Sequence, residues 1–84
     1  MIILTKPTLR HVITEDRETL TLTLRHKGRV FSAVVQRYCY SSLNCLTLFR
    51  NSEIVQKVPR IENSFCETVD AAKIALLGLA QETA

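Results

Sequence analysis

The chain of 84 residues is poor in glycine and proline, has no tryptophan, and carries an odd number of cysteines. Cys39, Cys45 and Cys66 lack the paired spacing of a secreted disulfide framework and form no Cys-x-x-Cys motif. His11 and His26 lie far apart in the sequence, so we expect neither a metal nor another cofactor. These absences predict free thiols and a cytoplasmic location.

Long apolar runs are also missing. Residues 1–4 are apolar, but Lys6 and Pro7 end this stretch before it could form the core of a signal peptide. Residues 74–80 are nearly uncharged, yet they are far too few to cross a bilayer. The sequence therefore predicts no membrane segment.

What is present is typical of one globular domain spanning residues 1–84. Hydrophobic residues make up 46% and charged residues 23%, and the net charge of +3 is only mildly basic. A core of this size leaves a small margin of stability. Because disulfides and metals are not expected, oligomerisation is the remaining common source of extra stability.

A β-hairpin is the clearest local prediction. Residues 18–25 alternate leucine with threonine, as in a strand with one apolar face. Lys27 and Gly28 follow, and glycine readily adopts the positive φ of a two-residue hairpin turn. A slip of the strand pairing by one residue would place the leucines opposite residues that project to the other side of the sheet. With Lys27 and Gly28 as the turn, the apolar pairs are Leu24 with Phe31, Leu22 with Ala33, and Leu20 with Val35.

Three other segments are predicted to extend the sheet. A loop over residues 40–44 precedes a strand over 45–50, and a turn at Asn51-Ser52 leads to a strand over 54–58 that Pro59 ends. Residues 9–14 form a further strand, joined to the hairpin through residues 15–17. The expected sheet is an antiparallel meander of four to five strands.

A C-terminal helix completes an α+β fold and packs on one face of the sheet. Ser64 and Glu67 fit a capping box, with Thr68 as an alternative cap one turn later, and the helix runs to about Gln81. At helical spacing one apolar stripe covers the sheet. Its members are Phe65, Val69, Ala72, Leu76 and Leu79.

A second face of this helix carries small and apolar residues away from the core stripe, where a monomer would be polar. They are Ala71, Ile74, Ala75 and Gly78, and Leu77 also lies off the core side. Scattered exposed apolar residues are normal on protein surfaces. We nevertheless expect this face to contact a partner protein or a second copy of the chain.

The function predicted from these features is binding without catalysis. No nucleophile has an orienting acid or base beside it in sequence, and neither Cys39 nor Cys66 has a known catalytic context for pairing with His11 or His26. The expected protein is a homodimer that acts as an accessory or inhibitory protein-interaction module. It would use the helix or a sheet edge.

Nucleic-acid binding is the alternative function. Arg25, Lys27 and Arg29 cluster at the hairpin turn, and Arg37 extends this basic surface along the next strand. Charged hairpin tips also serve solubility alone. Salt dependence distinguishes the two functions, because phosphate contacts weaken steeply with salt whereas apolar contacts do not.

Overall fold

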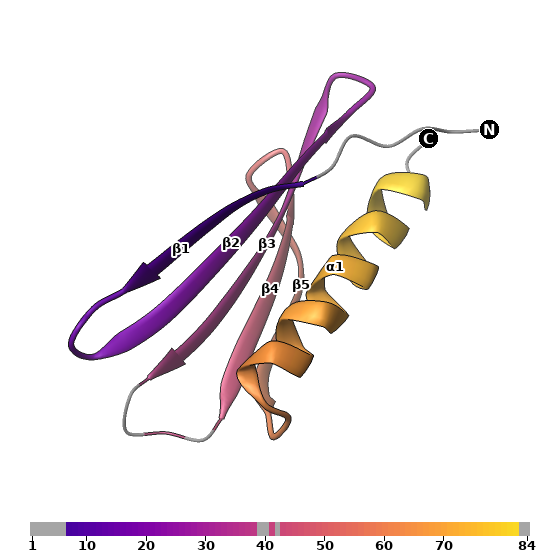
Figure 1. The fold of residues 1–84 in the computed structure, drawn as a ribbon. Coiled ribbons are helices and arrows are strands. Elements are labelled where there is room, and N and C mark those ends of the chain that lie inside the picture. Colours follow the sequence, from indigo (N-terminus) through magenta and orange to yellow (C-terminus); the bar gives the residue numbers. More distant parts are fainter. Residues whose placement is uncertain (1–6, 39–40, 42, 83–84) are drawn as a thin grey trace.

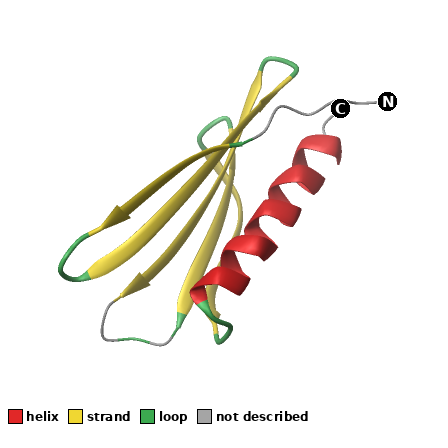
Figure 2. Cartoon of the chain, in the orientation of Figure 1, coloured by secondary structure: helices red, strands yellow, loops and turns green. Residues whose placement is uncertain are grey.

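The computed structural model describes residues 7–38, 41 and 43–82, which form five strands and one helix (Figures 1 and 2). The strands make one antiparallel sheet in the order β1-β2-β3-β4-β5, and α1 lies along one of its faces. This confirms the predicted α+β meander with a C-terminal helix. The elements are β1 (Thr8–Ile13), β2 (Arg17–His26), β3 (Arg29–Tyr38), β4 (Asn44–Arg50), β5 (Glu53–Ile61) and α1 (Phe65–Glu82).

The β2–β3 hairpin has the register that the sequence predicts. Leu24 pairs with Phe31 and Leu20 with Val35. Lys27 and Gly28 form the turn with φ of 52° and 75°. Positive φ at both positions matches the right-handed twist of the two strands.

Replacing Gly28 with valine should test this turn. A Cβ at Gly28 would meet no atom within 4 Å, so the cost comes from backbone strain alone. We expect the free energy of unfolding to fall by about 1–2 kcal/mol, because a β-branched residue disfavours the left-handed region. Urea denaturation measures the loss, and Gly28→Asn, which tolerates positive φ, is the control. A valine variant as stable as the wild type would place the turn elsewhere.

Strand β5 corrects the predicted end at Val58, since it continues through Pro59 to Ile61. Between the pairs Leu46–Val58 and Asn44–Ile61, β5 contains one residue more than β4. A proline is tolerated at such an irregularity on an edge strand, where its missing N–H breaks no ladder. The same pairing shows that Asn44, which the sequence placed in a loop, is the first residue of β4.

Ser64 caps α1, and the alternative cap at Thr68 is wrong. The backbone N–H of Glu67 donates to Ser64 Oγ at 3.2 Å, as in one half of a capping box. Thr68 is instead buried, where its hydroxyl donates to Ser64 O at 2.9 Å and accepts from Asn44 Nδ2 at 3.2 Å. Asn44 Nδ2 also donates to the carbonyl of Asn63. These bonds fix the start of the helix against β4.

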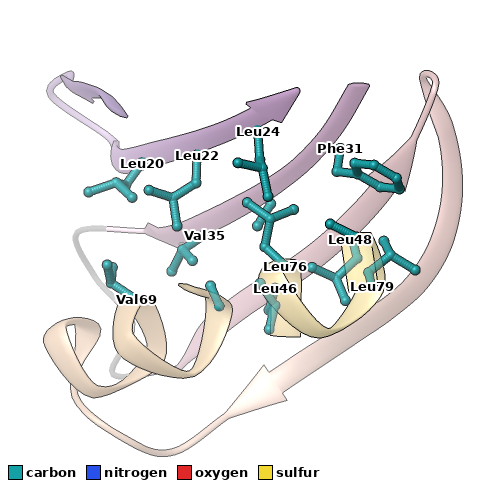
Figure 3. Packing of buried hydrophobic residues seen from close by; sticks show 13 residues of the cluster. Leu20, Leu22, Leu24, Phe31, Val35, Leu46, Leu48, Val69, Leu76 and Leu79 are labelled. Carbon is teal, nitrogen blue, oxygen red and sulfur yellow. The ribbon is translucent and has the colours of Figure 1, made fainter. Parts of the chain in front are cut away.

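The core is the single layer between the sheet and α1 (Figure 3). The predicted helix stripe faces this layer, and Leu77, which was expected off the core side, packs against its margin. Helix α1 packs chiefly on β3, with β2 and β4 on either side. Five strands span roughly 19 Å between the outer strand axes, whereas a helix is only about 10 Å across. One helix therefore leaves β1 exposed along its length, while β5 packs against the core through Val58 and Ile61 near its end.

Candidate functional site

The exposed apolar side chains gather on the edge strands. Among the described residues, the large apolar side chains that stay exposed include three on β1 and two on β5, against one on α1 and Tyr38 at the end of β3. Edge strands offer unsatisfied backbone groups for pairing with another chain. The apolar residues on the edges are Leu9, Val12 and Ile13 on β1, and Ile54 and Val55 on β5.

The two edges differ in how well they are protected. Strand β5 has two register irregularities against β4, and it carries Lys57 and Pro59, all of which disfavour pairing with a further strand. Strand β1 pairs with β2 without irregularity at all six positions and contains neither lysine nor proline. Strand β1 is therefore the edge that is open to another strand.

The backbone of β1 presents specific groups to this open edge. The N–H of Thr14 donates to Arg17 O at 2.9 Å in the β1–β2 turn. Because backbone groups of an antiparallel pair alternate in direction, the N–H and C=O groups of Leu9, His11 and Ile13 point away from β2. In the same turn the Thr14 hydroxyl donates to Asp16 Oδ1 at 2.7 Å and lowers the pKa of that carboxyl.

The side chains of these three residues project on the face that carries α1. Leu9 lies opposite Leu22 and His11 opposite Leu20, and both leucines belong to the core. Leu9 is nevertheless 55% exposed and Ile13 68% exposed, because α1 reaches β1 at His11 through Phe65 and leaves these two side chains uncovered. In Figure 1, β1 is the strand at the sheet edge farther from α1.

A groove of about 540 Å³ lies between this edge and the first half of α1. Its apolar lining comes from Leu20, Phe65 and Val69. Polar side chains of the strands and of the helix line the rest. Helix residues Asp70 and Lys73 supply charges of opposite sign at its border. The groove can therefore accept an apolar side chain with a polar or charged end.

Glu18 contacts two basic side chains in this groove, those of His11 and Arg37. Its Oε2 lies 2.8 Å from His11 Nε2, and its Oε1 accepts from Arg37 Nη2 at 3.2 Å. The three residues come from β1, β2 and β3. Their side chains are 20–41% exposed, so solvent screens the pairs and they contribute little to stability. Their effect is to hold His11 in a defined orientation beside the open edge.

Phe65, the first residue of α1, contacts both partners of Glu18. The His11 ring stacks on it with a centroid separation of 6.1 Å and an interplanar angle of 19°. The guanidinium carbon of Arg37 lies 5.5 Å from the centroid of the same ring. The capped helix start thus ties β1 to the rest of the fold and shapes one end of the groove.

The predicted partner face of the helix is only partly exposed. Ile74 is 73% exposed and Ala71 is exposed, whereas Ala75 and Gly78 are half-buried and Ala75 packs against the core cluster. Exposed Lys73 and Gln81 also lie on the solvent side of the helix. The apolar part of this face is therefore narrower than the sequence indicates.

The predicted basic surface is divided. Arg25, Lys27 and Arg29 lie together at the β2–β3 turn, but Arg37 lies at the other end of β3, where it binds Glu18. The two ends are roughly 26 Å apart along an extended strand. Nucleic-acid binding stays a prediction, with three cations at the hairpin tip as its candidate contacts.

The described residues offer no candidate site for cysteine or metal chemistry. Cys45 and Cys66 are free thiols, and Cys39 lies outside the described residues. Cys66 and His11 line the same groove, but His11 Nε2 already contacts Glu18. Within residues 7–38, 41 and 43–82 no group of three metal-ligating side chains occurs, and no helix is long and apolar enough to cross a membrane.

The sequence predicted a sheet edge as one possible binding surface, but it neither singled out β1 nor predicted the groove. Pro7 and the alternation of Leu9, His11 and Ile13 were the available signals, since together they indicate an edge strand with one apolar face. No protein-family model, curated protein or solved structure matches the chain.

Proposed function

We propose that this chain is a non-enzymatic protein-interaction module that binds another polypeptide by adding a strand to β1. The observation that carries this proposal is the difference between the two sheet edges. Strand β5 has two register irregularities, a lysine and a proline, whereas β1 pairs regularly with β2 and exposes Leu9, Val12 and Ile13. Main-chain hydrogen bonds along such an edge supply affinity, and neighbouring pockets select the side chains.

The groove supports the same function because it adjoins the open edge. A strand added at β1 would project every second side chain on the sheet face that carries α1, next to Leu9, His11 and Ile13. Long side chains there can reach the groove, where Phe65 and Val69 offer apolar contact and Asp70 and Lys73 offer charge. A sheet edge rather than the back of α1 is thus the favoured binding surface. The free thiols support the proposed cytoplasmic location.

Selection from a library of random-sequence peptides displayed on phage tests this function. Peptides enriched on the immobilised protein should lose about tenfold or more in affinity when Leu9 is replaced by lysine, because the charge disturbs the apolar edge. The matched control is Ile54→Lys on β5, which replaces an exposed aliphatic residue and should leave binding unchanged. Enriched peptides that bind Leu9→Lys and the wild type equally would contradict strand addition at β1.

A further inference from the structure

Strand addition at β1 has one candidate partner whose sequence is known, namely a second copy of the chain. We propose that β1 pairs antiparallel with β1 of a second copy about a twofold axis at His11, so that two sheets join into one. This inference rests on the proposed use of the β1 edge and names its occupant. Homodimers of soluble proteins are most often built on such isologous contacts.

Symmetry leaves few registers for this pairing. Directly opposite residues of an antiparallel pair project to the same face, so a twofold axis must relate residues of β1 that share a face. Every residue of β1 meets this condition. An axis at one of the two central residues, Arg10 or His11, leaves most of the strand paired, and Val12 is the next position toward the β1–β2 turn. Each choice fixes which side chains of the two copies lie opposite one another.

Two of the three registers are unfavourable. An axis at Arg10 sets two arginines directly opposite each other, which is destabilising. It also aligns Ile13 with Pro7 of the second copy, and proline has no N–H to donate. An axis at Val12 places Leu9 opposite Glu15 of the second copy, an exposed acidic residue. Neither register matches apolar residues with one another on the helix side.

The axis at His11 makes β1 self-complementary. Leu9 then lies opposite Ile13 of the second copy, twice per dimer, and Arg10 lies opposite Val12 rather than another cation. The open-edge N–H and C=O groups of Leu9, His11 and Ile13 all find partners within the same six-residue strand. Two side chains that are 55% and 68% exposed in the single chain become apolar cross-strand pairs.

The two histidines that meet at the axis are each held by their own subunit. Glu18 contacts His11 at 2.8 Å, and the stacked Phe65 ring keeps the imidazole in place. A carboxylate therefore lies beside each ring of the pair. Because both copies present the same sheet face, the two α1 helices lie on the same side, and the two grooves adjoin above the paired β1 strands.

Sedimentation equilibrium with charge variants tests this pairing. The wild type should have twice the 9.5 kDa mass of one chain at micromolar concentration. Leu9→Lys combined with Ile13→Lys should give the mass of one chain, since each introduced lysine faces another across the axis. Leu9→Lys combined with Ile13→Glu should restore the dimer, since each introduced lysine then faces an introduced glutamate. Circular dichroism of each variant checks that it is folded.

Ile74→Lys is the matched control on the helix, and it should keep the mass of two chains. A dimer that is lost with Ile74→Lys but kept with both β1 variants would overturn the pairing and the proposed use of β1. A wild-type monomer whose selected peptides still require Leu9 would overturn the self-pairing alone. Failure of the lysine–glutamate combination to restore the dimer would reject the register at His11.

Discussion

Replacing Phe31 with alanine is expected to lower the free energy of unfolding by about 3–5 kcal/mol. Phe31 is fully buried and is the largest of the fully buried side chains. It lies opposite Leu24 in the layer that the sheet shares with α1 (Figure 3). Removing its ring forfeits the transfer free energy of the buried atoms and leaves a cavity that the surrounding core fills only partly.

The loss should be a large share of the total, because a chain of 84 residues is typically stable by about 4–13 kcal/mol. Urea denaturation at fixed protein concentration measures it. The control is Phe49→Ala, since Phe49 lies on the opposite face of the sheet, where it is half-buried. Equal losses for the two variants would mean that the core does not lie on the face covered by α1.

The second large effect concerns the two faces of α1. Leu76→Ala is expected to cost about 2–5 kcal/mol, because Leu76 is completely buried against the sheet. Ile74→Ala should change stability by no more than about 0.5 kcal/mol, because Ile74 is 73% exposed. Both changes remove an aliphatic side chain of similar volume from the same helix, so differences in helix propensity contribute little.

Thermal unfolding at two protein concentrations distinguishes the alternatives for Ile74. If Ile74→Ala lowers the unfolding temperature strongly at high concentration and weakly at low concentration, Ile74 lies in a contact between chains. That outcome would support the helix face over the β1 edge as the interface. A concentration-independent change near zero agrees with solvent exposure.

The hairpin and the core stripe of the helix could be predicted because local pattern determines both. Alternating leucines before Lys27-Gly28 allow one register that matches apolar residues on a single face. The helix stripe follows from the helical repeat, and Ser64 provides the cap where the stripe begins. The end of β5 was not predicted, because a proline is compatible with a strand only when that strand lies at an edge, and this depends on the whole sheet order.

The groove could not be predicted in full for a similar reason. The contact between Glu18 and Arg37 follows from the hairpin register, which places them opposite each other. His11 joins them only because the β1–β2 turn sets a second register, and Phe65 joins them only because α1 starts over that end of the sheet. The exposure of Leu9 and Ile13 depends on a single helix being narrower than five strands.

Amide hydrogen exchange of β1, followed by NMR at low and high protein concentration, tests most directly whether β1 is the binding edge. At low concentration we predict fast exchange at Leu9, His11 and Ile13 and slow exchange at Arg10 and Val12, whose N–H groups face β2. At concentrations where the mass is that of two chains, all five amides should exchange slowly. Fast exchange at Leu9, His11 and Ile13 in the fully dimeric protein would contradict the account.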